Sequence, residues 1–121
     1  MKRFELGRLI WAVIPDLNGY AKPNPRPAMV TQQVDANDDD LIPVIVGSTR
    51  VVDPPPDDQV VIHSTYQQDP VTKLSRPTAL ILTWIAAVKC SDIQRLGGII
   101  RGKRAHPIIK KSLELLRPPN K

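Results

Sequence analysis

The chain has 121 residues, enough for one domain that buries roughly two thirds of the surface its unfolded state exposes. It is 41% hydrophobic and 4% aromatic, and 17 basic against 12 acidic residues give a net charge of +5. The single cysteine, Cys90, excludes an intramolecular disulfide and no Cys/His spacing typical of zinc sites occurs, so we expect a cytoplasmic protein without a metal or cofactor.

Three apolar segments in the first part of the chain are predicted to be strands. Residues 9–14 form a short apolar run that ends at a proline, and residues 28–34 are extended up to an Asp/Asn-rich turn over residues 35–40. Residues 41–46 follow this turn. Pro43 lacks an amide donor, which predicts that this third strand lies at a sheet edge.

The middle of the chain is predicted to contain two more strands. Residues 53–58, with three consecutive prolines, indicate a stiff exposed connection. Residues 59–63 are the next strand, and residues 64–77 form a long polar loop of a kind that is often functional. Residues 78–88 are β-branched and continuous, which predicts a long central strand. Thr83 interrupts this longest apolar run, so we expect no signal peptide or membrane span.

The C-terminal part is predicted to be helical in two places. Residues 91–96 indicate one helical turn, capped by the serine at its start and ended by Gly97 and Gly98. Residues 107–116 predict a helix with Pro107 in its first turn. Its apolar residues recur at helical spacing: Ile109, Leu113 and Leu116.

This order of elements predicts a single domain over residues 1–121. The chain has no internal repeat and no break in composition, and five or so strands precede a terminal helix. The fold class is therefore mainly β with a C-terminal helix, a small barrel or half-barrel of about five to seven strands. From residue 72 onward the chain contains eleven lysines and arginines and only two acidic residues. This basic half could bind a polyanion such as RNA or an acidic protein segment, or it could be a solvated surface with no partner.

The order of several short motifs resembles the PemK/MazF family of toxins from toxin–antitoxin pairs. The motifs are GRLIW over residues 7–11, RPAMV over residues 26–30, VIVGST over residues 44–49, and LGGII over residues 96–100 before the terminal helix. The resemblance covers nearly the whole chain.

The resemblance implies a small SH3-like β-barrel that acts as a homodimer. Such toxins cleave single-stranded RNA at short sequences without a metal, leaving a cyclic phosphate. They are typically silenced by an antitoxin whose extended acidic C-terminal segment occupies the RNA groove. The basic half of this chain suits both partners, because phosphates and carboxylates compete for the same positive field.

The resemblance places the family's arginine, directly before a proline at the start of the second strand, at Arg26. Metal-free RNA cleavage needs a base, an acid and a group that stabilises the charged phosphorane. A guanidinium offers forked donors for two phosphate oxygens and hardly ever loses its proton, so Arg26 is predicted to contact phosphate. Pro25 and Pro27 restrict the backbone on both sides and favour an extended Arg26.

The family's hydroxyl residue at the end of the third strand falls at Thr49, or at Ser48 if the alignment shifts by one residue. Either hydroxyl could donate a hydrogen bond to the scissile phosphate. The alternative is that both hydroxyls satisfy backbone groups in the turn after Gly47.

The chain departs from the family pattern at the remaining catalytic positions. Other members carry an arginine and an acidic residue on the late strand, and some carry a histidine in the first loop. Here residues 80–87 have no charge and the first loop has no histidine, so the general acid and base are unassigned. Thr83 is the nearest polar group on that strand. His63 could serve as acid or base, or be an ordinary strand-end histidine.

Aromatic and basic residues in the loops are the candidates for holding RNA. Single-stranded RNA is recognised by stacking, for which Tyr20 and Tyr66 are the exposed candidates, whereas Trp11 and Trp84 are expected in the core or a dimer interface. The remaining RNA-binding candidates are Lys22, His63, Lys73 and Arg76.

Two further functions fit the same barrel. The uncharged late strand favours a degenerate barrel that binds RNA or an antitoxin-like peptide without turnover. A topoisomerase poison, acting through C-terminal residues, ranks last because the ending over residues 116–121, LRPPNK, lacks a tryptophan-type anchor.

Overall fold

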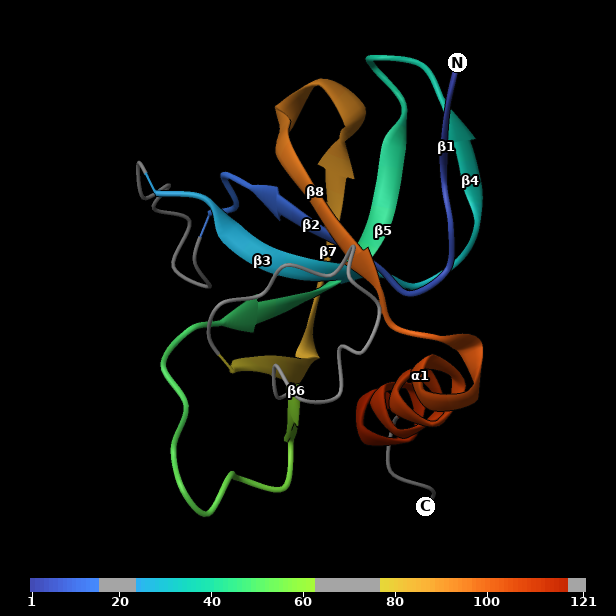
Figure 1. Ribbon diagram of the computed structural model, residues 1–121. Coiled ribbons are helices and arrows are strands. Elements are labelled where there is room, and N and C mark those ends of the chain that lie inside the picture. The colour runs from blue at the N-terminus through green and yellow to red at the C-terminus, as the bar shows by residue number, and fades with distance from the viewer. Residues whose placement is uncertain (16–23, 63–76, 118–121) are drawn as a thin grey trace.

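The computed structural model describes residues 1–15, 24–62 and 77–117 (Figure 1). Eight strands, one 3₁₀ turn and one α-helix occur in this part of the chain. In chain order they are β1 (Lys2–Phe4), β2 (Arg8–Ala12), β3 (Arg26–Val30), β4 (Val34–Ala36), β5 (Leu41–Ser48), β6 (Gln59–Ile62), β7 (Thr78–Lys89), the 3₁₀ turn (Cys90–Asp92), β8 (Ile93–Ile99) and α1 (Gly102–Leu116). The predicted mainly β fold with a C-terminal helix is confirmed, with eight strands instead of five to seven.

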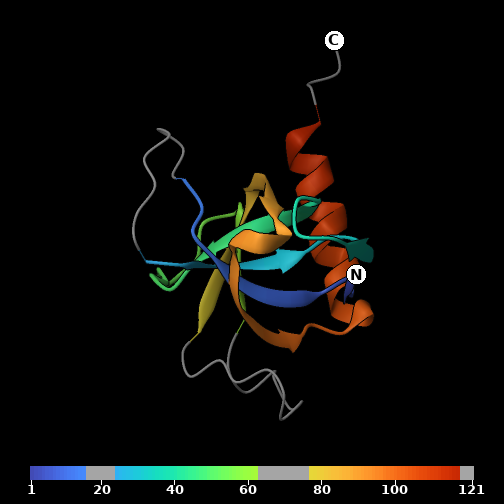
Figure 2. The ribbon, with the colours of Figure 1, turned by 90° about the horizontal axis from the view of Figure 1, so that it is seen from above.

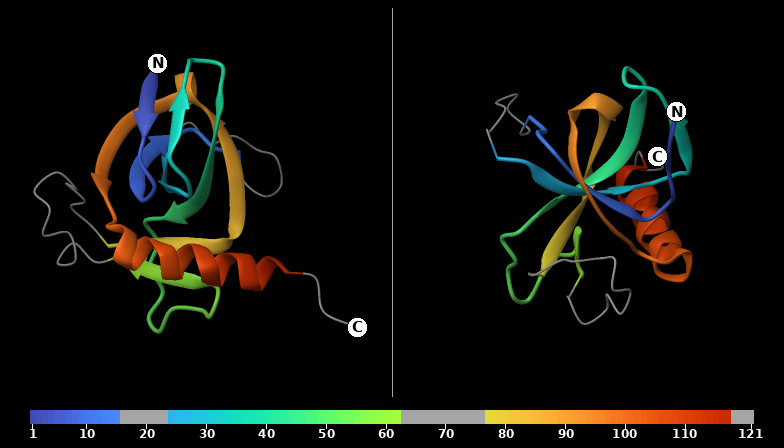
Figure 3. Two further views of the ribbon diagram at one scale, coloured as in Figure 1. Left: turned by 90° about the vertical axis from the view of Figure 1, so that its right-hand side faces the viewer. Right: turned by 45° about the horizontal axis from the view of Figure 1, so that its top comes forward.

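The strands form two antiparallel sheets. Six of them are ordered β6-β7-β5-β3-β2-β8, and β1 pairs with β4 in a separate two-stranded sheet. The large sheet curls strongly on itself, and α1 crosses below it (Figure 3, left). Figure 2 shows the helix along one side of the strands. In the described part of the chain the edge strands β6 and β8 share no ladder, so the curled sheet is not closed by hydrogen bonds.

The middle of the large sheet is buried on both faces because its strands are apolar on both faces there. One face packs Ile10, Ala28 and Val44 into a cluster that also holds Phe4 of β1 and Trp84 of β7. Alternate residues point the other way, and that face buries Leu9, Met29, Ile45 and Leu82 against Ala105 and Ile108 of α1. Burial of each large side chain stabilises the fold by about 1.5–3 kcal/mol.

The helix is joined to the sheet at both of its ends. Gly7, which has φ +88°, ties the chain before α1 to the sheet. Its backbone nitrogen donates to the Val30 oxygen and its own oxygen accepts from the Ile100 nitrogen, each at 2.8 Å. A Cβ at Gly7 would overlap the Ile100 carbonyl oxygen, so only glycine fits. Near the end of α1, the buried Ser112 hydroxyl donates to the backbone oxygen of Leu82 on β7.

The structure places β5 in the interior of the sheet, so the predicted edge strand over residues 41–46 was wrong. β5 lies between β7 and β3. Pro43 is tolerated because the β3–β5 ladder ends at the Val30–Val44 pair. The carbonyl oxygen of Pro43, which points to the same side as its nitrogen, accepts a hydrogen bond of 3.1 Å from the backbone nitrogen of Thr31. The missing Pro43 donor therefore falls just beyond the ladder.

The helical turn predicted over residues 91–96 was also wrong. A 3₁₀ turn covers only Cys90–Asp92, has no side-chain cap, and is followed directly by β8. Gly97 and Gly98 belong to β8, where a Cβ at Gly97 would lie 3.1 Å from Cβ of Leu9 on β2. Gly97 lets β8 approach β2 closely, and neither glycine ends a helix.

The predicted C-terminal helix exists but begins five residues earlier, at Gly102. Pro107 lies in the helix interior and not in its first turn. The buried face is also different, because Leu113 and Leu116 are 65% and 46% exposed. The buried helix residues are Ala105, Ile108 and Ser112.

The predicted exposed connection is confirmed, because residues 53–57 are all exposed. The predicted long loop over residues 64–77 lies outside the described residues except for Pro77. Among the described residues, no helix combines the length and the hydropathy that crossing a membrane requires.

Candidate functional site

Arg26 and Ser48 come together at the ends of two neighbouring strands. Arg26 opens β3 and Ser48 closes β5. The two strands are antiparallel, with Ala28 opposite Val46. Continuing this register by two residues brings Arg26 level with Ser48, and both side chains project to the same face of the sheet. Residues that are far apart in the sequence are therefore adjacent here.

A polar cavity of about 360 Å³ lies at this pair of strand ends. Its described lining residues include two arginines, a serine and a threonine but no carboxylate: Asn24, Pro25, Arg26, Pro27, Gly47, Ser48, Thr49 and Arg50. Two lining cations produce a positive potential, so the cavity is suited to an anion such as phosphate.

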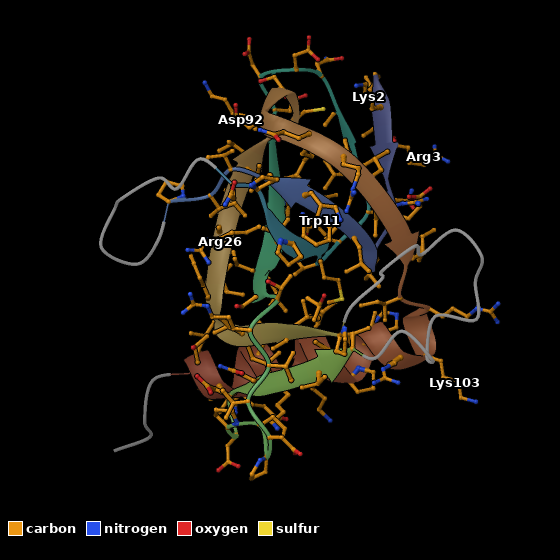
Figure 4. All side chains as sticks on the ribbon, turned by 60° about the vertical axis from the view of Figure 1, so that its left-hand side comes forward. Lys2, Arg3, Trp11, Arg26, Asp92 and Lys103 are labelled. Atoms are coloured by element: carbon orange, nitrogen blue, oxygen red, sulfur yellow. The ribbon has the colours of Figure 1, made fainter. Side chains whose placement is uncertain are left out.

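Arg26 is partly buried and rests on an aromatic ring. Its Cζ lies 5.0 Å from the centroid of the Trp84 ring, a cation–π contact worth about 0.5–2 kcal/mol. Figure 4 shows Arg26 beside the tan ribbon of β7, the strand that carries Trp84. Nε of Arg26 is buried and has no hydrogen-bond partner. An unpaired buried donor is costly, so a shift of the guanidinium that exposes Nε to a ligand oxygen would remove part of that cost.

The two hydroxyls of the cavity differ in their surroundings. Oγ of Ser48 accepts a hydrogen bond of 3.0 Å from the backbone nitrogen of Arg50, which is the turn role that the sequence left open. Its own hydroxyl proton is still available to donate to a ligand. Thr49 is exposed at the cavity rim.

Gly47 explains why the chain can place Ser48 here. The β5–β7 pairing shifts register between Ile45 and Gly47, which is a bulge immediately before the cavity. A Cβ at Gly47 would lie 2.9 Å from the carbonyl oxygen of Ala79 on β7. The absence of a side chain therefore allows β5 to lie against β7 directly before Ser48.

Two residues of the site were missed by sequence reasoning. Arg50 lines the cavity, and its place directly after Ser48 and Thr49 was a signal that could have found it. Trp84 was assigned to the core or to an interface, and it is 9% exposed, but its ring also supports Arg26. Sequence spacing gives no signal for that contact, because it depends on how β3 and β7 face each other in the curled sheet.

The late strand carries a carboxylate neighbour that the sequence did not indicate. Oγ1 of Thr83 donates a long hydrogen bond of 3.5 Å to Oδ2 of Asp58, which precedes β6. Neither residue lines the cavity beside Arg26. Among the residues that the structure describes, those lining the cavity include no histidine, aspartate or glutamate, so this part of the lining has no conventional general acid or base.

The loop candidates for RNA binding lie outside the described residues: Tyr20, Lys22, His63, Tyr66, Lys73 and Arg76. The other tryptophan, Trp11, is partly buried on β2, where Cζ of Arg95 lies 4.8 Å from its ring centroid (Figure 4). The described residues contain no group of three or more potential metal ligands.

Comparison with known proteins adds no family to these observations. No family model matches the chain, and no curated protein matches it significantly.

Proposed function

We propose that the protein is the toxin of a toxin–antitoxin pair, a metal-independent endoribonuclease of the PemK/MazF kind that cleaves single-stranded RNA. The observation that carries the proposal is the cavity that Arg26, Ser48, Thr49 and Arg50 line together. The motif order that resembles the family has its arginine and its hydroxyl residue at two of these positions.

The chemistry assigned to the cavity is in-line attack on a phosphodiester. The ribose 2′ oxygen loses its proton and bonds to phosphorus, the bond to the 5′ oxygen breaks, and that oxygen takes up a proton. The products are a 2′,3′-cyclic phosphate and a free 5′-hydroxyl. Arg26 and Arg50 would bind the two non-bridging oxygens, and the hydroxyl of Ser48 or Thr49 would donate to the same charge as it grows.

The architecture supports the proposal at a coarser level. A strongly curled antiparallel sheet with a C-terminal helix is compatible with an SH3-like barrel. A homodimer, and an antitoxin with an acidic C-terminal segment as inhibitor, are parts of the same proposal. The acidic segment would compete with RNA for the two guanidinium groups.

A second candidate function is RNA or antitoxin-peptide binding without cleavage. It is favoured because the described residues that line the cavity include no histidine, aspartate or glutamate. Arginine and hydroxyl groups alone bind a phosphate well, but they move a proton poorly near neutral pH.

The experiment incubates the purified protein with a long RNA in the presence and absence of EDTA and maps the cut ends. Arg26→Ala removes the phosphate contact, and Arg95→Ala is a matched control, because it also removes an arginine from a tryptophan ring. We expect cutting in EDTA by the wild type and by Arg95→Ala, and none by Arg26→Ala. Binding without cutting supports the second function, and the absence of both contradicts both functions.

Expression in growing cells gives an independent measurement. The wild type is expected to arrest growth and Arg26→Ala to be tolerated. Harmless wild-type protein at high expression would contradict the toxin assignment.

A further inference from the structure

A second cavity, of about 440 Å³, adjoins the site through Trp84. Its two sides are the chain after β2 and the second half of β7, and it is closed at one end by the turn after β7. The lining residues are Val13, Ile14, Pro15, Leu41, Trp84, Ala86, Ala87, Val88, Lys89, Ser91 and Asp92. Its volume falls within the usual range for small-molecule sites.

Among the described residues, no strand pairs with the edge of β7 along this cavity. Cys90 donates from its backbone nitrogen to Asp40, so even-numbered residues of this stretch bond to β5. The backbone groups of Ala87 and Lys89 therefore point away from β5. In the described part of the chain β6 pairs only with residues 78–81 of β7, so no strand covers them. They are available as donors and acceptors for a ligand.

The remaining lining gives the cavity an apolar floor and a polar end. Ile14, Val88 and Trp84 are buried and supply flat apolar surface, while Lys89, Ser91 and Asp92 are exposed at the turn. Figure 4 shows Arg26 and Asp92 along the same ribbon of β7, with Asp92 close to the end of the strand. An apolar floor with hydrogen-bonding groups around it matches a planar heterocycle that has polar edges.

Trp84 joins this cavity to the phosphate site. The ring that lines the second cavity is also the ring beneath Arg26, with Cζ 5.0 Å from its centroid. A nucleotide carries its base about one sugar away from its phosphate, so a strand held at Arg26 can reach this cavity with a neighbouring base. A peptide strand could also pair with the free edge of β7, but the shared tryptophan and the cationic neighbour favour a nucleic acid.

We propose that this second cavity is a nucleobase subsite, which holds an unpaired base adjacent to the phosphate bound at Arg26. The inference rests on the proposed RNA function and deepens it. The apolar residues and Trp84 bind the face of the base, and the free groups of β7 together with Asp92 bind its edge. Base selectivity of RNA binding would arise here, because the arginines of the Arg26 cavity are assigned to phosphate, which is the same in every nucleotide.

The experiment uses Trp84 as its own reporter. The chain has two tryptophans, so Trp11→Phe leaves Trp84 alone to fluoresce. In this background, short oligoribonucleotides and an abasic ribose-phosphate strand of equal length are titrated into the protein. We expect every base-containing strand that binds to change the Trp84 emission, and the abasic strand to bind more weakly with a smaller change.

Two variants separate the subsite from the phosphate site. Ala87→Phe fills the cavity from an exposed position, and Ile85→Phe is the matched control, because it adds an aromatic ring to the same edge outside the lining. We expect Ala87→Phe to lower the affinity for base-containing strands by about tenfold or more. Its affinity for the abasic strand should stay within about twofold of the wild-type value. Asp92→Asn is a smaller change. It is expected to alter the order of affinities for strands that carry the four different bases, without loss of binding to the abasic strand.

The outcomes distinguish failure of the inference from failure of the proposed function. If the wild type binds RNA through Arg26 but Ala87→Phe changes base-containing and abasic strands equally, or changes neither, the subsite is wrong and the phosphate site survives. If the wild type binds no RNA, both proposals are lost. If Ala87→Phe abolishes binding of an extended acidic peptide and leaves RNA binding unchanged, the cavity is a peptide groove and the nucleobase subsite is overturned.

Discussion

Replacement of Gly47 by alanine is expected to destabilise the protein where β5 lies against β7. A Cβ at this position would lie 2.9 Å from the backbone oxygen of Ala79, 3.2 Å from Cγ2 of Thr78 and 3.3 Å from Cδ2 of Leu80. Rotation of a side chain cannot relieve the contact with a backbone atom, so the two strands must separate locally. Overpacking of this kind costs about 1–3 kcal/mol of the free energy of unfolding.

The measurement is thermal unfolding followed by circular dichroism. With an entropy of unfolding of about 2.1 cal/mol/K per residue, 1 kcal/mol corresponds to about 4 °C for a chain of this length, so Tm should fall by about 4–12 °C. RNA binding or cleavage should also weaken, because the substitution displaces Ser48 relative to Arg26.

Gly102→Ala is the matched control. Its added Cβ would meet only the His106 ring, at 3.4 and 3.5 Å, and alanine favours the helix more than glycine by up to about 1 kcal/mol. The Tm of this variant should stay the same or rise. Equal Tm values for Gly47→Ala and Gly102→Ala would refute the close approach of β5 and β7 at Gly47.

Three further substitutions test separate parts of the structure. The Thr78 hydroxyl is buried without a partner, so Thr78→Val should raise stability in urea unfolding by about 1 kcal/mol, and a loss would show that the hydroxyl is satisfied. The Arg8 hydrogen bond lowers the pKa of Glu5 from 4.5, so its stabilisation is present above that value and is lost as pH falls through the lower folded pKa. Glu5→Gln should therefore cost about 0.5 kcal/mol near neutral pH, with a difference that shrinks in acid; a constant difference would contradict the ion pair. Arg26→Lys keeps the charge but loses Nε and the fork, so RNA affinity should fall about tenfold or more while Arg95→Lys changes little.

The sequence predicted most strands of the large sheet because each is a continuous apolar run. The runs over residues 9–14, 59–63 and 78–88 correspond to β2, β6 and β7 within about two residues at each end. The same local signal fails for β1 and for β8. β1 is short and charged, and it exists because it pairs with β4; β8 contains two glycines and exists because it pairs with β2.

For the helix too, some features follow from the local sequence and others from contacts with the sheet. The sequence predicted its presence and its end, but its start at Gly102 lies in the stretch of residues 102–104, which has no apolar periodicity. The buried side of α1 is the side that meets β7, where Ser112 donates to Leu82. Leu113 and Leu116 are exposed, and the helix buries Ala105, Ile108 and Ser112 instead, a choice of face that helical spacing alone did not indicate.

For the candidate site, the sequence by itself determined which chemical groups were available: an arginine held extended between prolines, two hydroxyls after a glycine, and a late strand without charge. The tertiary structure alone decided that Arg26, Ser48 and Arg50 line one cavity and that Trp84 lies beneath Arg26 and beside a second cavity. The physical reason is register. Side chains alternate along a strand, so a shift of one residue in the β3–β5 pairing would turn Arg26 and Ser48 to opposite faces, and that register is set by packing across the whole sheet.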